Sequence, residues 1–368
     1  MPLRRMVPAE SDYEAADSER PETALTAIAP FVSIIVAARN ESRAIEDCLR
    51  GLAAQDYPAN RYEIVVVDGA STDDTVEQVR AAAEKDSRIS VVANPARTTP
   101  SAFNIGIRVA RGEIVGLMSA HGTPASNYIR RGVSDLSSTG AWGVGGRIAR
   151  VGMTPRQRAI GAATSSPFGV GDGVHNYGSQ LQWVETAFPG IWPRWVFERV
   201  GLFDPELVRN QDDELSFRIR AAGGRILYDP ALVVAYTPRS SLRGVFSQYR
   251  QYGMWKVRVY QKQPRAIRPR QLVPPVWIGV VVGGWLAAPL TMLGPVASIA
   301  ALASYGAVMG MAATRMGRRG IPRGDIFAAL AGVHLGYGVG MWSGLIRFAP
   351  RWVIDRRGRR ERLDPSPP

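Results

Sequence analysis

Short apolar runs alternate with amphipathic stretches from Phe31 to about Pro238. The runs FVSIIVAARN, YEIVVVDGAS, ISVVANP and EIVGLMS are rich in β-branched residues and end in polar ones, which is typical of buried strands. Between them, AIEDCLRGLAAQ, DDTVEQVRAAAEKD and SAFNIGIRVARG space their apolar residues as helices do. Strict alternation of strand and helix predicts an α/β domain with a doubly wound, mostly parallel, Rossmann-like sheet.

The pattern changes after Arg270, where three nearly uncharged apolar stretches follow. They cover Val276 to Leu293, Pro295 to Thr314 and Asp325 to Ile346, and each has roughly the length of a membrane span. We expect a membrane region of two to three apolar helices over residues 271–346, with Gly294-Pro295 as a tight turn between the first two. Buried helices of a soluble domain are the alternative, but the chain offers no amphipathic partner helices for such a core.

Basic residues flank the first two apolar stretches on both sides: Lys256, Arg258, Lys262, Arg265, Arg268 and Arg270 before them, and Arg315, Arg318, Arg319 and Arg323 after them. The positive-inside rule therefore predicts that both flanks are cytoplasmic. Three full spans would place the basic tail, residues 347–368 with RRGRRER, outside, against the same rule. Either the third stretch is re-entrant or the tail is an exception.

Glycine recurs at every fourth residue of the third apolar stretch, at Gly332, Gly336, Gly340 and Gly344. This spacing places the four glycines in one ridge along a helix face. A ridge of small residues lets a second helix approach closely. We therefore expect helix–helix association through these four positions.

The chain of 368 residues has a formal net charge of +13 and a pI near 10.3. This charge indicates an acidic partner such as nucleic acid, anionic lipid or a phosphorylated substrate. Much of the basic excess lies beside the apolar stretches, where a membrane surface explains it, so no nucleic-acid partner is expected. The single cysteine, Cys48, excludes an intrachain disulfide and a Cys-cluster metal site. We expect it to be a small apolar filler on a helix.

Residues 1–30 carry Pro, Glu, Asp, Ser and Ala without an apolar core. We expect a disordered leader. The leader lacks the apolar segment of a signal peptide, so the globular part is expected to stay on the synthesising side of a membrane.

Polar residues follow three of the predicted strands: Arg39-Asn40-Glu41, Asp68-Gly69-Ala70-Ser71-Thr72-Asp73 and Ser119-Ala120-His121. Open α/β sheets bind their ligands at the carboxyl ends of the strands, where acidic groups can accept from a base or a ribose. Asp and Ser before a helix are equally often simple caps. A metal site here would usually be rich in carboxylates, whereas the third end offers a hydroxyl and an imidazole.

Two later stretches also carry candidate chemistry. NQDDELSFRIRAAGG places Asp212, Asp213 and Glu214 at a predicted helix start. The helix dipole accounts for one or two of these carboxylates, and the three together also suit a general base whose neighbours tune its pKa. FSQYRQYGMWK places Gln251 and Trp255 just before the apolar region, in a predicted interfacial amphipathic helix near residues 243–262.

The order of these motifs from Val32 to about Lys256 resembles the family 2 glycosyltransferases, which have the GT-A fold. The matching pieces are SIIVAARNE, VVVDGASTDDT, NIGIRVARGEIVGLMSAH, RNQDDELSFRIRAAG and QYGMW. TPSAFNIGI and VRNQDDELSFRIRAAGGRILYDP are similar to the membrane-attached bacterial exopolysaccharide enzymes of the ExoA type, which act in succinoglycan synthesis. The resemblance implies a GT-A catalytic domain over residues 31–270, followed by transmembrane helices.

The resemblance also implies roles for individual residues. Asp68 would face the uracil of a UDP-sugar, and Asn40 and Glu41 would lie beside the nucleoside. Asp212 takes the place of the catalytic base, and Asp213 and Glu214 become neighbours of the base or of the acceptor.

Gln251 and Trp255 match the ends of the family's Gln-x-x-Arg-Trp element, which closes over the diphosphate and the acceptor. Met254 replaces the arginine of that element. A charge contact is therefore missing there, and Arg250 or Lys256 is expected to compensate.

Ser119-Ala120-His121 stands where the family has Asp-x-Asp, or Asp-x-His in the ExoA-like group. The last position normally binds the divalent cation, and a neutral imidazole at His121 suits Mn²⁺ better than Mg²⁺. Ser119 can hydrogen-bond the donor but brings no charge. Either Mn²⁺ is held by His121 and the diphosphate, or basic residues stabilise the leaving group instead. A capping serine and a packed histidine are the remaining alternative.

The function implied by this resemblance is that of an inverting hexosyltransferase of the cell (inner or plasma) membrane, with a cytoplasmic catalytic domain. The enzyme would move a sugar from a UDP-sugar to a polyprenyl-diphosphate-linked saccharide in exopolysaccharide or cell-envelope glycan synthesis. Two alternatives stay open. One is a polyprenyl-phosphate mannose or glucose synthase, and the other is a non-catalytic membrane scaffold with a degenerate donor site, suggested by Ser119 and Met254.

Overall fold

The computed structural model describes residues 29–363 except 172, 174–175 and 318–319. Residues 1–28 of the predicted leader and 364–368 of the predicted tail lie outside the described residues. The chain forms two compact units. The first unit runs to Val151 and resumes over Gly173–Thr237, and the second consists of Gly152–Asp172 and the chain from Pro238 onward.

The first unit contains the predicted alternation of strands and helices. Its elements are β1 (Val32–Ala38), α2 (Ile45–Ala53), β2 (Tyr62–Asp68), α3 (Thr75–Lys85), β3 (Ile89–Ala93), α4 (Thr99–Val109), β4 (Ile114–Ser119), β5 (Gly122–Pro124), α5 (Tyr128–Thr139), β6 (Gly143–Arg150), β7 (Gln182–Val184), β8 (Gly190–Pro193), α8 (Arg194–Val200), α9 (Gln211–Ala221) and β9 (Ile226–Tyr236). The four strands and three helices expected between Phe31 and Ser119 are confirmed.

The strands of the first unit form one sheet in the order β3-β2-β1-β4-β8-β6-β9-β5, and β7 also pairs with β9. The half made of β3, β2, β1 and β4 is parallel, as predicted. β8 is inserted antiparallel between β4 and β6, and β5 and β7 run antiparallel to β9. The sheet is therefore mixed, and its parallel half carries the three polar strand ends.

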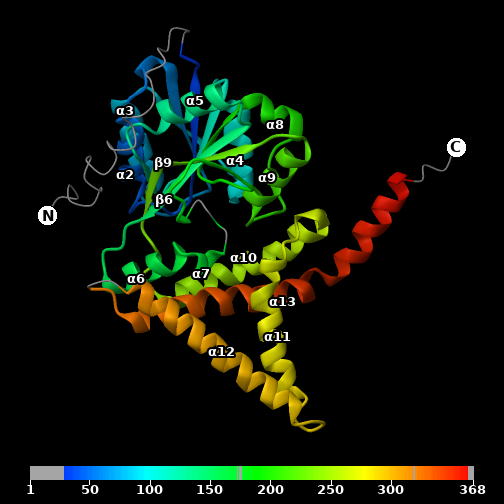
Figure 1. Cartoon of the computed structure of the whole chain (residues 1–368). Helices are drawn as coiled ribbons and strands as arrows, with labels where there is room; N and C mark the ends of the chain where they lie inside the picture. Colours follow the sequence, from blue (N-terminus) through cyan, green and yellow to red (C-terminus); the bar gives the residue numbers. More distant parts are fainter. Residues whose placement is uncertain (1–28, 172, 174–175, 318–319, 364–368) are drawn as a thin grey trace. The chain divides into compact units, whose positions relative to one another are not determined.

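Alternate residues of the central strands face two hydrophobic cores. Val32, Ile34 and Val36 pack with α2, α3 and α5, whereas Ile35 packs with α4, α8 and α9. Figure 1 shows α2 and α3 on one side of the sheet and α8 and α9 on the other. Cys48 is fully buried in the first core, as expected for an apolar filler. Helices on both faces confirm the doubly wound α/β architecture.

The second unit is helical. Its elements are α6 (Pro155–Thr164), α7 (Pro167–Val170), α10 (Leu242–Lys262), α11 (Val273–Leu286), α12 (Leu293–Met316) and α13 (Arg323–Leu363). Among the described residues, two helical segments are long and apolar enough to cross a membrane, Leu293–Met316 and Arg323–Trp352. This criterion uses length and composition alone.

The turn between the first two apolar helices lies earlier than the sequence suggested. α11 ends at Leu286, residues 287–292 form the connection, and α12 begins at Leu293. Gly294 and Pro295 are therefore inside α12, and the expected turn at these two residues is wrong. Proline fits here because the first turn of a helix has no use for its missing N–H group.

The glycine ridge of α13 packs against α10 within the same chain. A β-carbon on Gly336, Gly340 or Gly344 would lie 2.6, 2.1 or 2.5 Å from a carbonyl oxygen of α10. Those oxygens belong to Phe246, Arg250 and Met254, which are also spaced by four. The predicted close helix packing is confirmed at these three glycines, and the partner helix is α10. At Gly332, the fourth predicted position, a β-carbon would lie 3.8 Å from the Leu242 carbonyl oxygen, which is only ordinary contact.

Candidate active site

The carboxyl ends of β1, β2 and β4 lie side by side. Ala38 pairs with Asp68 and Ala37 pairs with Ser119 across the parallel sheet. The backbone N–H of Ala120 continues this alignment by donating to the carbonyl of Ala37 at 3.1 Å. The three polar strand ends that the sequence singled out therefore meet at one edge of the sheet.

Asp68 is held by the loop that follows it. The backbone N–H of Ser71 donates to one of its carboxylate oxygens at 3.1 Å, and the Ser71 hydroxyl donates to the other at 2.5 Å. Asp68 is only 7% exposed. A carboxylate has about four acceptor positions, so Asp68 retains capacity to accept from a ligand.

The loop after β1 is joined to the loop after β2. The Asn40 backbone N–H donates to the Ser71 hydroxyl at 2.9 Å, and the Thr72 N–H donates to the Asn40 side-chain oxygen at 2.8 Å. Asn40 has a positive φ of 54°, which asparagine tolerates better than most residues. Asn40 is thus a bridge between the two loops as well as a candidate donor contact.

Asp73 fixes the base of the same two loops. It accepts from the Thr75 hydroxyl and from the Ser42 backbone N–H, the latter at 3.2 Å. Hydrogen bonds from Thr75 and Ser42 outweigh a small opposing effect of burial and lower the pKa of Asp73 to about 2. The carboxylate therefore stays ionised and the loops stay connected at any ordinary pH.

His121 reaches across the sheet edge to Glu41. Its Nδ1 lies 2.9 Å from Glu41 Oε1, and its ring meets the edge of Tyr236 at a centroid distance of 5.2 Å. The side chains of His121 and Glu41 are 41% and 27% exposed. When Nδ1 donates to a carboxylate, Nε2 is the nitrogen left to accept, which is the arrangement that many metal-binding histidines use.

A metal ion at this edge would have few protein ligands. Across residues 29–363 with their gaps, no group of three or more His, Cys, Asp or Glu side chains could hold a metal ion. His121 and Ser119 are the polar groups at the end of β4, and Ser119 brings no charge. The donor set therefore fits an ion whose remaining ligands come from elsewhere, such as phosphate oxygens.

The candidate base lies at the start of α9. Asp212 and Asp213 are half-buried in its first turn. The residue before the helix, Asn210, has a positive φ of 59°. Glu214 is different, because Arg218 donates to both of its carboxylate oxygens at 2.9 and 3.0 Å. Arg218 also donates to the carbonyls of Gly201 and Leu202. Glu214 therefore anchors α9 to the preceding loop.

Asn104 is a contact that sequence reasoning did not assign. Its side-chain N–H₂ donates to the Phe203 carbonyl at 2.8 Å, and its oxygen accepts from the Phe203 N–H at 2.9 Å. Asn104 is 6% exposed and lies 99 residues from its partner. It fixes the segment that leads to Asn210 and Asp212. The motif TPSAFNIGI contained this asparagine, but nothing local in it indicates so distant a partner.

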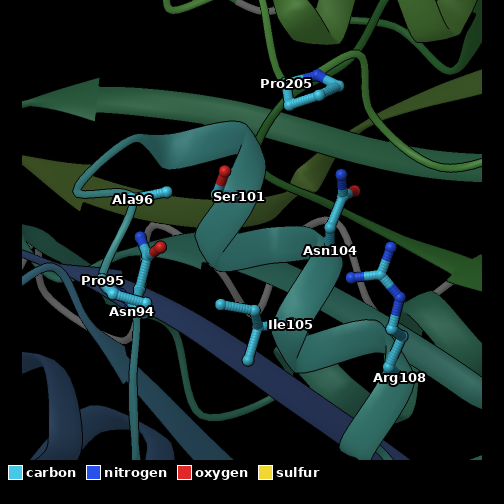
Figure 2. A pocket seen from close by; sticks show the side chains of 8 residues that line it. All are labelled: Asn94, Pro95, Ala96, Ser101, Asn104, Ile105, Arg108 and Pro205. Atoms are coloured by element: carbon cyan, nitrogen blue, oxygen red, sulfur yellow. The ribbon is translucent and has the colours of Figure 1, made fainter.

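A hollow of about 200 Å³ lies beside the same sheet edge, after β3 (Figure 2). Its lining residues are Asn94, Pro95, Ala96, Ser101, Asn104, Ile105, Arg108 and Pro205. The Asn94 N–H donates to the Asp68 carbonyl at 2.7 Å, whereas its buried side-chain oxygen has no hydrogen-bond partner within the described part of the chain. None of the predicted donor-binding residues lines this hollow, so the strand ends are the stronger candidate.

Gln251 and Trp255 belong to α10, in the second unit. Trp255 packs on Phe348 of α13, with ring centroids 5.4 Å apart, and Gln251 is half-buried. Lys256 is only 7% exposed, whereas Arg250 is exposed. The guanidinium of Arg347 lies 4.0 Å from the Met254 sulfur. An arginine from α13 thus stands beside the position where the family element has its own arginine.

The two other histidines of the sequence are His175 and His334. His175 lies outside the described residues. His334, in α13, is 3.0 Å from the Tyr305 hydroxyl of α12, so it belongs to the packing of the helical unit.

Comparisons with known proteins identify the family. The family model described as Glycosyl transferase family 2 matches residues 33–179. The succinoglycan biosynthesis protein ExoA of Rhizobium meliloti is 31% identical over 321 residues, which cover 86% of this chain and 96% of that protein. A Methanococcus voltae protein named dolichyl N-acetyl-alpha-D-glucosaminyl phosphate 3-beta-D-2,3-diacetamido-2,3-dideoxy-beta-D-glucuronosyltransferase is 28% identical, over 61% of this chain and 73% of its own.

Among solved structures, the mannosyltransferase PcManGT from Pyrobaculum calidifontis, in complex with GDP-Man and Mn²⁺, superposes with a TM-score of 0.53. The two chains are 23% identical, and the match covers 94% of this chain and 93% of that one. This likeness supports the GT-A-like fold. The family model and the ExoA relative establish that the chain belongs to the family 2 glycosyltransferases.

Proposed function

We propose that this transferase moves a sugar from a UDP-sugar to a lipid-linked saccharide, with inversion at the anomeric carbon. The observation that carries the proposal is the single sheet edge at which Asn40, Asp68 and the Glu41–His121 pair meet. A nucleoside would bind against Asp68 and Asn40, whose loops are fixed in advance by their mutual hydrogen bonds. Preorganised polar groups of this kind bind a ligand without a large ordering cost.

In the proposed reaction, Asp212 accepts the proton of an acceptor hydroxyl. The oxygen then attacks the anomeric carbon as the bond to the donor diphosphate breaks, and UDP leaves with that bond's electrons. A single displacement converts an α-linked donor into a β-linked product. Asn104 and the Glu214–Arg218 pair act as positioning residues, because they hold the segment before α9 and the start of α9 itself.

A divalent cation would be held by His121 Nε2 and by the donor's phosphate oxygens, with Glu41 orienting the imidazole. When bound, such an ion neutralises charge on the departing diphosphate. The imidazole favours Mn²⁺ over Mg²⁺. Ser119 would donate a hydrogen bond to the donor. Arg347 is our candidate for the positive charge that Met254 lacks, since its guanidinium lies 4.0 Å from the Met254 sulfur.

The acceptor proposal rests on the apolar helices and on the relatives. The M. voltae relative carries a dolichyl phosphate-linked sugar in its name. Helices α11 and α12 and the arginines around them would keep the enzyme at an anionic membrane surface, on the cytoplasmic side by the positive-inside rule. The proposed setting is exopolysaccharide or cell-envelope glycan synthesis.

A donor and acceptor screen on membranes that contain the full chain tests this proposal. The assay follows release of UDP against GDP and detects the lipid product by mass. We expect UDP release that depends on a polyprenyl-diphosphate-linked saccharide. A product on plain polyprenyl phosphate would favour the synthase alternative, and donor binding without any transfer would favour the scaffold.

A further inference from the structure

Helices α11 and α12 form an apolar hairpin that extends away from the paired helices α10 and α13 (Figure 1). Its end is strongly exposed: Leu286, Leu290, Met292 and Leu293 are 76%, 89%, 76% and 77% accessible. Residues 271–314 contain no Asp, Glu, Lys or Arg. Exposed apolar surface of this extent is unfavourable in water, which indicates that a membrane or another molecule covers it.

The two arms of the hairpin hold each other. The Ser298 hydroxyl donates to the Val281 carbonyl at 2.9 Å, and a β-carbon on Gly284 would lie 2.4 Å from the Gly294 carbonyl oxygen. At the other end, the Trp277 indole N–H donates to the Ala301 carbonyl at 3.0 Å. Helices in lipid commonly associate through small residues and short polar contacts of this kind.

α11 is too short to cross a bilayer, and only part of α12 is free to enter one. α11 has 14 residues, which corresponds to a length of about 21 Å, against a hydrocarbon thickness of about 30 Å. α12 is longer, but its last turns are not free to enter lipid. Met309, Ala312 and Ala313 are buried against α6 and α13. The part of α12 with exposed apolar side chains runs from Leu293 to Met311, and most of it ends near Val308.

α13 cannot serve as an independent span, because α10 accompanies it. The close approaches at Gly336, Gly340 and Gly344 continue to Phe348, whose carbonyl accepts from the buried Gln261 side chain at 2.8 Å. α10 carries five cationic side chains and no acidic ones: Arg243, Arg250, Lys256, Arg258 and Lys262. A helix with such charge is strongly disfavoured in the hydrocarbon core. A helix packed along it is held out of the core as well.

Aromatic residues gather at the base of the hairpin. Trp277 stacks near Tyr305 with ring centroids 4.5 Å apart, and the Trp342 indole N–H donates to the Pro275 carbonyl at 2.9 Å. Tryptophan and tyrosine favour the level of the lipid headgroups. Basic amphipathic helices favour the same level at an anionic surface. The base of the hairpin and the α10–α13 pair thus share one preferred depth.

We propose that the protein is a monotopic membrane enzyme, which enters the bilayer from one side only. The α11–α12 hairpin inserts its apolar end into the hydrocarbon without crossing it, and the α10–α13 pair lies on the surface. Both ends of the hairpin and the whole of α13 are then on the same side. This arrangement places the basic tail with the other basic flanks, which three full spans would not do. It rests on the proposed membrane attachment.

Cysteine labelling of the full chain tests the arrangement. Burial raises the pKa of the native Cys48 to about 12, so the unmodified chain is a nearly silent background. Single cysteines are introduced as Leu290→Cys at the hairpin end, Gly324→Cys at the start of α13 and Arg351→Cys near its far end. Met292→Cys repeats the first position if Leu290→Cys fails to accumulate. A membrane-impermeant maleimide is applied to sealed vesicles of each orientation.

We expect Gly324→Cys and Arg351→Cys to react in vesicles of the same orientation, and Leu290→Cys to react in neither until detergent is added. Reaction of Arg351→Cys only from the face opposite Gly324→Cys would show that α13 spans the bilayer and would overturn the proposal. Reaction of Leu290→Cys from that opposite face would overturn it too, because the hairpin would then cross. A Leu290→Cys disulfide dimer in the membranes would assign the hairpin end to a second copy instead.

The membrane attachment itself has a separate readout. Vesicles are washed with carbonate and with high salt before labelling, and the protein is measured in the pellet. Release of the full chain into the wash would refute attachment. Retention combined with opposite-face labelling would refute only the monotopic arrangement.

Discussion

The two compact units hold their shape by different means. In the first unit, loops from distant strands are joined by side chains, such as Asn40 to Thr72 and Asn104 to Phe203. In the second unit, α10 and α13 meet where side chains are missing, at the glycines of the ridge. We expect a conservative change of a candidate catalytic or metal-binding side chain in this unit to impair chemistry before it impairs the fold. A methyl group on the ridge should impair the fold first.

The largest effect is expected at Asp212. Asp212→Asn keeps the shape of the side chain and removes the proton acceptor, so turnover should fall by roughly 10² or more. Binding of UDP, measured by calorimetry on the full chain in detergent, should stay near normal. Asp213→Asn is the matched control and should retain most activity. If Asp213→Asn loses turnover instead, Asp213 is the catalytic base. Normal turnover in both variants would show that the base does not lie on α9.

The next effect concerns the Glu41–His121 pair. His121→Ala should weaken Mn²⁺ binding in the presence of UDP more than any other single change at this edge. Glu41→Gln should weaken it by about 10- to 100-fold, the usual cost of losing the group that orients a metal-binding histidine. Ser119→Asp should strengthen it, because one negative charge is added near the cation. Binding is read from the electron paramagnetic resonance signal of free Mn²⁺, independently of turnover.

Glu46→Gln removes an exposed carboxylate on the neighbouring helix α2 and is the control for the Mn²⁺ titration. It should leave Mn²⁺ binding unchanged. Unaltered binding in His121→Ala, together with full activity in excess chelator, would remove the metal from the mechanism. Stabilisation of the leaving group would then fall to basic residues such as Arg250 or Arg347.

The second unit is tested by two glycine substitutions. Gly340→Ala places a methyl group where the Arg250 carbonyl oxygen would be 2.1 Å away, so α10 must move. Overpacking of this kind lowers the free energy of unfolding by about 1–3 kcal/mol. Gly310→Ala in α12 meets no atom within 4 Å and should be neutral, or stabilising by up to about 1 kcal/mol. Thermal unfolding in detergent should separate the two variants, and equal midpoints would contradict close packing at the ridge.

The same contrast explains what the sequence could and could not reveal. Strand ends are local features, because an apolar run of β-branched residues followed by Asp68 or His121 is visible in a few letters. Strict alternation of strands and helices predicts parallel strands, and the carboxyl ends of parallel strands lie at one edge of the sheet. No other information is needed to predict that these polar ends meet. The spacing of the α13 glycines was equally visible, and it correctly predicted close packing. The sequence did not identify α10 as the partner helix, because the row of α10 carbonyl groups that lies against the glycines exists only once both helices have formed.

Contacts between distant segments escaped prediction for the same reason. Asn104 and Phe203 are 99 residues apart, and neither residue has a chemical character that indicates the other. Glu214 was grouped with Asp212 and Asp213 because all three follow one another, yet Arg218 one turn later engages it. The turn at Gly294-Pro295 was misplaced because these residue types mark turns in general. Proline is nonetheless well accommodated in the first turn of a helix.

The smallest effect is expected at Glu63, which lies at the start of β2, at the opposite edge of the same sheet. Its carboxylate accepts from the Ser33 hydroxyl at 2.6 Å and from the Arg111 backbone N–H at 2.8 Å. Burial alone would raise the pKa of Glu63, but these hydrogen bonds and the Arg111 charge outweigh it and hold the pKa below its usual value. A carboxylate with a lowered pKa stabilises the fold above its unfolded pKa, and this stabilisation is lost as pH falls through the folded value. Glu63→Gln should therefore lower the free energy of unfolding by about 1 kcal/mol near pH 7. This corresponds to a decrease of about 2–4 °C in the unfolding midpoint. The difference in stability from wild type should shrink below about pH 4. Glu113→Gln, an exposed carboxylate close by, should show no such pH dependence, and turnover should be normal in both variants. A Glu63→Gln deficit that stays constant down to pH 3 would mean that shape rather than charge holds this edge together.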